Sequence, residues 1–94
     1  MVTVTTRAKE ELKRVVEIRS LGPGKFLRLA VPPVWGGEGD FGIVVDDQGP
    51  EDQEFSFQGL RVLLVDSDLA NRLSTSVLDF KQSAGVSSFT LDVF

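Results

Sequence analysis

The 94 residues of this chain include neither cysteine nor histidine, and this absence constrains both the fold and the chemistry. No disulfide and no cysteine- or histidine-bound metal can hold the fold together, so its stability must come from a hydrophobic core. Apolar residues make up 41% of the chain, an ordinary share for a globular protein and one that argues against disorder. We therefore expect one domain spanning residues 1–94.

The same absence removes the usual ligands of zinc, copper, haem and iron–sulfur clusters, and the usual nucleophiles and proton shuttles. No histidine can activate the serines, which include Ser74, Ser76, Ser83, Ser87 and Ser88. The sequence predicts a non-enzymatic protein with no cofactor. Only carboxylate oxygens remain as ligands, and these suit hard cations such as calcium, magnesium or ferric iron.

Charge and hydropathy limit the partners. The net charge is −4, and the basic residues concentrated between Arg7 and Arg28 are interleaved with acids, so we expect no nucleic-acid binding. The start of the chain lacks an apolar stretch of signal-peptide length, and the longest aliphatic run, residues 62–65, cannot span a bilayer. The expectation is a soluble, cytoplasmic protein without a membrane partner.

The hydrophobic pattern predicts an α+β fold that is mainly β. A short strand at residues 2–5 precedes an amphipathic helix that begins near Arg7, with Thr5 or Thr6 as its cap. Ala8, Leu12, Val15 and Val16 form the inner stripe of this helix, and charged residues, Glu11 among them, are expected on its solvated face.

Strands dominate the rest of the chain. The predicted strands are residues 26–31, 41–45, 55–57, 60–65, 77–80 and 88–94. A short helix at 69–73 is predicted after Asp66-Ser67-Asp68, which supplies a capping residue and acidic side chains for its first turn. The uninterrupted apolar run 41–45 predicts a strand covered on both faces. Gln58 and Gly59 fit the two-residue turn of a tight hairpin.

The loop before residue 41 carries the two motifs that attract attention. Residues 37–42 match the G-x-G-x-x-G pattern, but a strand rather than a helix is predicted after them, and Glu38 and Asp40 would repel a pyrophosphate. Trp35, the only tryptophan, either anchors a partner or ligand, folds back over the sheet edge, or packs in a homodimer.

The acidic turn formed by Asp46, Asp47, Glu51, Asp52 and Glu54 matches no calcium-loop template, so we expect solvated charges there.

Several short segments spread along the whole chain follow a familiar order. They are Val4-Thr5-Thr6-Arg7-Ala8 with Glu11-Leu12, Leu27-Arg28-Leu29-Ala30-Val31, Phe41-Gly42-Ile43, Asp46-Asp47, Gly59-Leu60-Arg61-Val62, Val65-Asp66, Leu78-Asp79-Phe80 and Ser88-Phe89. In this order they resemble the A-type iron–sulfur carrier (HesB/IscA-like) family. The resemblance implies a compact barrel-like β-sandwich with one N-terminal amphipathic helix and one short helix.

The resemblance does not extend to cluster ligation. In that family the loop before the Phe41-like aromatic carries the first cysteine, whose position falls on Gly36 here, and a C-x-C pair follows the last strand, about where these residues end at Phe94. A glycine offers no thiolate to a cluster. The chain is most similar to cysteine-less members of the family.

The resulting hypothesis is a non-enzymatic accessory or binding module that self-associates and touches the iron–sulfur machinery through protein contacts. Its ligand or partner loop consists of Trp35, Gly36, Gly37, Asp40 and Phe41. A second hypothesis is a carrier of iron or a small ligand that uses carboxylates or the Trp35 loop. A third is a degenerate fold kept only as a structural subunit.

Overall fold

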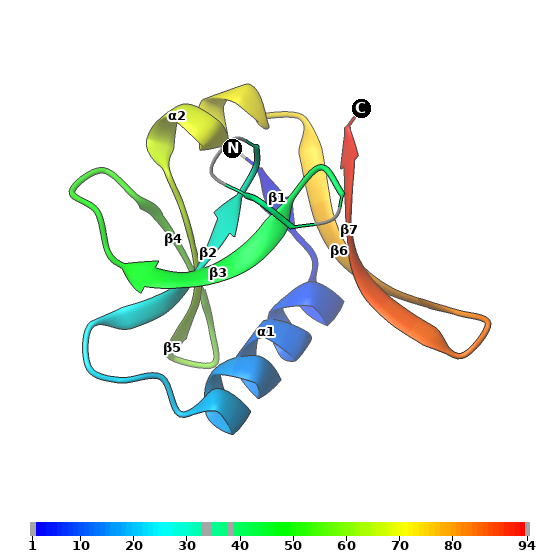
Figure 1. The fold of residues 1–94 in the computed structure, drawn as a ribbon, viewed down its shortest axis with the longest axis horizontal. Helices are drawn as coiled ribbons and strands as arrows, with labels where there is room; N and C mark the ends of the chain where they lie inside the picture. The colour runs from blue at the N-terminus through cyan, green and yellow to red at the C-terminus, as the bar shows by residue number, and fades with distance from the viewer. Residues whose placement is uncertain (1, 33–34, 38, 94) are drawn as a thin grey trace.

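The computed structural model describes residues 2–32, 35–37 and 39–93 (Figure 1). Along these ranges the elements are β1 (Thr3–Val4), α1 (Thr6–Arg19), β2 (Lys25–Ala30), β3 (Gly42–Asp47), β4 (Gln53–Phe57), β5 (Leu60–Val65), α2 (Ser67–Arg72), β6 (Ser76–Ser83) and β7 (Val86–Val93). Neither helix is both long enough and apolar enough to cross a membrane within the ranges described.

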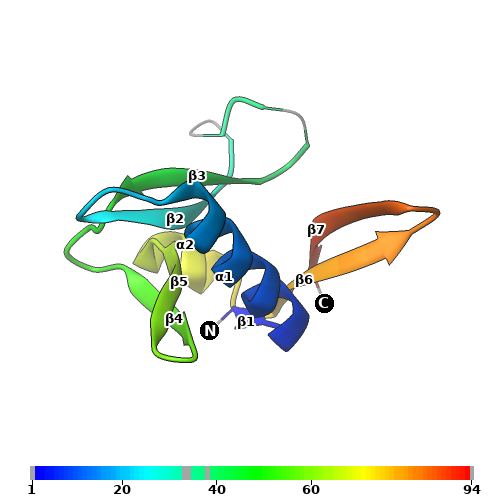
Figure 2. The same ribbon diagram turned by 90° about the horizontal axis from the view of Figure 1, so that it is seen from below.

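The strands form two mixed sheets. The larger has the order β3-β2-β5-β4, with β2 and β5 parallel and the outer pairs antiparallel. The smaller has the order β1-β6-β7, with β1 parallel to β6 and β7 antiparallel to it. Both sheets are open, and α1 packs against strands of both (Figure 2). The predicted α+β, mainly β class with one longer and one short helix is confirmed.

Helix α1 begins where the sequence predicts. The Thr5 side chain accepts a hydrogen bond from the backbone N–H of Ala8 at 3.1 Å, which satisfies one of the unpaired donors at the helix start. Ala8 and Leu12 are fully buried, as their spacing predicts. The expectation for Glu11 was wrong, because its side chain is only 9% exposed. It forms an ion pair with Arg14, one helical turn on, which is 63% exposed.

The centre of the larger sheet is β5. Residues 62–65 in this strand are all completely buried, whereas β3, for which the sequence predicted cover on both faces, lies at the sheet edge and leaves Val45 47% exposed. An apolar run can form a strand at the centre or at the edge of a sheet, because its hydrophobicity does not specify how many strands pair with it. The prediction for residues 41–45 was therefore right in expecting a strand, which begins at Gly42, and wrong in expecting both of its faces to be covered.

Two hairpins use two-residue turns with left-handed backbone. Gln58 (φ 52°) and Gly59 (φ 79°) join β4 to β5, which confirms the predicted hairpin. Ala84 (φ 51°) and Gly85 (φ 78°) join β6 to β7 in the same way. The sequence analysis placed a strand on either side of this second turn without pairing them, since alanine is not typical of a left-handed turn position.

Candidate functional site

The loop predicted to bind a partner connects β2 to β3, and its described residues include 35–37 and 39–41 (Figure 2). At its start the backbone N–H of Trp35 donates to the carbonyl oxygen of Val31 at 3.0 Å, which turns the chain after β2. The Trp35 side chain is half-buried. Part of the indole is therefore covered by the protein, and part faces solvent.

The cover comes from two glycines of the G-x-G-x-x-G pattern. A Cβ atom built on Gly37 would lie 2.4 Å from the indole Cζ2, and one built on Gly42 would lie 2.4 Å from three indole carbons. Only glycine permits so close an approach of backbone and ring. Gly39 supplies a positive φ of 85° instead. The spacing therefore serves the packing of Trp35, and strand β3 rather than a helix follows it.

The five predicted residues lie in this one loop but differ in exposure. Gly36, Gly37 and Asp40 are exposed, whereas Phe41 is half-buried and packs against the hydrophobic core. Glu38, the other acid of the pattern, lies outside the described residues. The described part of the loop thus presents a partly exposed indole, two exposed glycines and an exposed carboxylate, and Phe41 packs its far end against the core.

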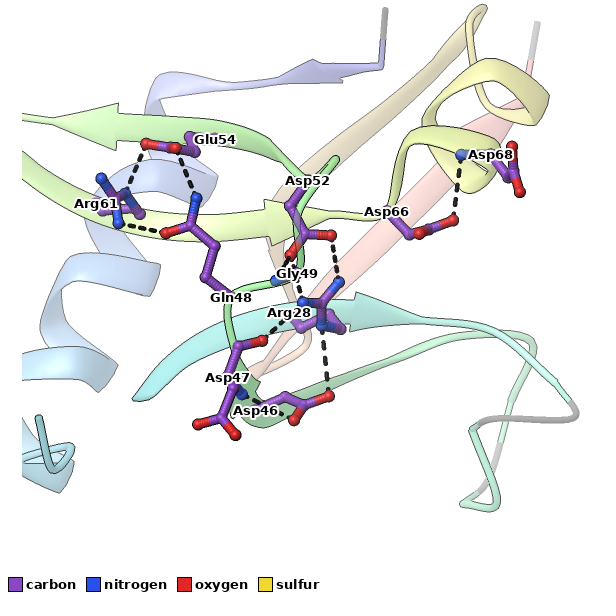
Figure 3. A network of polar contacts seen from close by, with 10 residues as sticks. All are labelled: Arg28, Asp46, Asp47, Gln48, Gly49, Asp52, Glu54, Arg61, Asp66 and Asp68. Atoms are coloured by element: carbon purple, nitrogen blue, oxygen red, sulfur yellow. Dashed lines mark hydrogen bonds and ion pairs between the residues drawn. The ribbon is translucent and has the colours of Figure 1, made fainter. Parts of the chain in front are cut away.

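The acidic turn between β3 and β4 has a structural role that the sequence analysis missed (Figure 3). Two Arg28 nitrogens donate to the two carboxylate oxygens of Asp52, one of them at 2.7 Å, and the Asp52 side chain is only 2% exposed. Arg28 also donates to the carbonyl oxygen of Asp47 at 2.8 Å, and Asp46 lies 3.6 Å from its Nε. These contacts join β2 to the turn.

The pKa values follow from this geometry. Hydrogen bonds from Arg28 lower the pKa of Asp52 below its usual value of 3.8. Burial raises this pKa, but by less than Arg28 lowers it, and the N–H of Gly49 lowers it further. The Asp52 carboxylate is therefore ionised at neutral pH and paired. The clue in the sequence was Arg28 alone within the apolar strand 26–31, since a charge half-buried in a sheet needs a partner.

A second group of polar side chains closes the other side of the turn. Arg61 forms an ion pair with Glu54 at 2.7 Å and donates to Gln48 at 2.7 Å, and Gln48 in turn donates to Glu54 at 2.7 Å (Figure 3). The Arg61 guanidinium also stacks on the Phe26 ring, 5.0 Å from its centroid. Most acids of the turn are thus engaged by side chains of the same sheet.

Asp40, Asp46 and Asp47 are carboxylates that a carrier of iron could use, but they do not converge. Asp40 precedes β3, whereas Asp46 and Asp47 end it, and this strand spans about 17 Å from Gly42 to Asp47. Across residues 2–32, 35–37 and 39–93 no three carboxylates gather in a way that could hold a metal ion. Two further acids, Asp66 and Asp68, cap and begin α2, where Asp66 accepts a hydrogen bond from the N–H of Asp68 at 3.1 Å.

Segments that carry the family resemblance meet in the structure as scaffold contacts. The Thr5 hydroxyl donates to the Asp79 carboxylate at 2.7 Å and so links the start of α1 to β6. This bond is the first cause of a lowered pKa at Asp79, followed by the N–H of Phe80. Thr5 and Asp79 therefore fix α1 against the smaller sheet.

Comparisons with known proteins identify the fold. No protein-family model matches the sequence, and no curated protein does. Among solved structures, Escherichia coli SufA, involved in biosynthesis of iron–sulfur clusters, superposes with a TM-score of 0.66 at 22% identity over 98% of this chain and 84% of SufA. IscA with a [2Fe–2S] cluster gives 0.60 at 22% identity, covering 99% and 82%. An Aquifex aeolicus protein solved by NMR gives 0.63 at 26% identity, covering 97% and 89%. The chain has the fold of these proteins.

Proposed function

We propose that this chain is a non-enzymatic binding or accessory module, linked to iron–sulfur cluster biogenesis through protein contacts. One observation carries the proposal: nearly the whole chain adopts the fold of SufA and IscA, while its 94 residues contain no cysteine and no histidine. A cluster needs thiolate or imidazole donors, and the position expected to supply the first thiolate is Gly36. The scaffold is retained without the ligands.

The proposed partner surface is the loop residues Trp35, Gly36, Gly37, Asp40 and Phe41. Its support is the half-exposed indole, held by backbone contacts on Gly37 and Gly42. A ring that is already positioned loses little conformational freedom on binding, and tryptophan is enriched among residues that dominate interface energies. Asp40 adds an exposed charge to the same loop.

The remaining parts of the proposal concern the setting. We place the protein in the cytoplasm as one domain over residues 1–94, self-associating, with a protein partner and with neither nucleic acid nor membrane as a target. The support is the net charge of −4 and the absence of a clustered basic surface in the sequence.

The test is binding to purified components of the iron–sulfur assembly machinery, measured by calorimetry with wild type and Trp35→Ala. We expect Trp35→Ala to weaken binding at least tenfold while the circular dichroism spectrum stays native. The control is Ile18→Ala, which removes an apolar side chain that is 64% exposed on α1, away from the loop. Equal affinities for all three proteins would remove the loop from the proposal, and no binding to any component would remove the link to the machinery.

A further inference from the structure

We draw no further inference here: the strongest candidate, the apolar groove between α1, β2, β3 and β7, carries nothing because nothing in the structure shows what covers it, and the one charged residue among the described residues that line it, Arg19, does not choose between a peptide, a small ligand and a second copy of the chain.

Discussion

The four-stranded sheet and the β6–β7 hairpin differ in how they are stabilised. The sheet has a fully buried central strand, β5, and a turn fixed by the Arg28–Asp52 pair. The hairpin relies on its own register, on Leu78 at its base and on an edge-to-face contact between Phe80 and Phe89, whose ring centroids are 5.0 Å apart. The comparison indicates that the sheet is the stable body of the fold and that the hairpin is its less buried part.

The largest expected difference is in the free energy of unfolding lost when a leucine is truncated in each region. Leu63→Ala in β5 removes a side chain with no exposed surface and should cost about 3 kcal/mol in the free energy of unfolding. Leu91→Ala in β7 truncates a half-buried side chain and should cost about 1 kcal/mol. Urea denaturation at a concentration where the chain is monomeric measures both. Equal losses would contradict the distinction between body and hairpin.

The two regions should also differ in how much their ion pairs contribute to the free energy of unfolding. Arg28→Ala leaves Asp52 enclosed without its cation and should cost roughly 2–3 kcal/mol. Lys81→Ala breaks an exposed pair with Asp92 on the hairpin, where both side chains are about half exposed, and should cost less than about 0.5 kcal/mol. Thermal unfolding monitored by circular dichroism compares them. The account fails here if Lys81→Ala proves the more destabilising.

A smaller effect should distinguish two glycines of the Trp35 loop. Gly42→Ala forces a methyl group against the indole and should cost about 1–2 kcal/mol, while Gly36→Ala meets no atom within 4 Å and should cost little. Trp35 is the only tryptophan, so its fluorescence reports the site directly. We expect a red shift of the emission for Gly42→Ala alone. Unchanged emission would show that the ring does not depend on this contact.

The smallest predicted effect is a pH dependence. Because its hydrogen bonds to Arg28 lower the pKa of Asp52, this carboxyl contributes stability that is complete above its unfolded pKa, near 3.8, and is lost as the pH falls through the folded value. Wild type should therefore exceed Asp52→Asn in stability at neutral pH, and the gap should narrow below about pH 4. Urea midpoints at several pH values measure it. In an Arg28→Ala background the narrowing should largely disappear; if it persists, another group causes it.

The sequence predicted most of the fold because its local signals were strong. The sequence named Thr5 as one of two candidate caps, placed the second cap within residues 66–68, and gave Gln58 with Gly59 as a hairpin turn. These predictions rest on side-chain and backbone chemistry that acts within a few residues. The edge position of β3 was not predictable, because strand order depends on contacts between distant segments. The pairing of β6 with β7 was missed for a local reason, because Ala84 is not typical of a left-handed turn position.

The candidate site was predictable only in outline. The sequence singled out Trp35 and the glycines near it, but could not tell that Gly37 and Gly42 pack under the indole. It also left Asp52 among solvated acids, although Arg28 within an apolar strand signalled a buried partner. The role of the loop residues as a partner surface stays a prediction.

Native mass spectrometry of the protein, purified without oxygen from its own host, tests the central claim most directly, namely that the carrier-like scaffold works through protein contacts without carrying a metal or cluster. The account predicts a homo-oligomer or a protein complex whose mass equals that of its polypeptides. A stoichiometric mass increment from iron, a cluster or a small molecule would contradict it and would favour the carrier hypothesis instead.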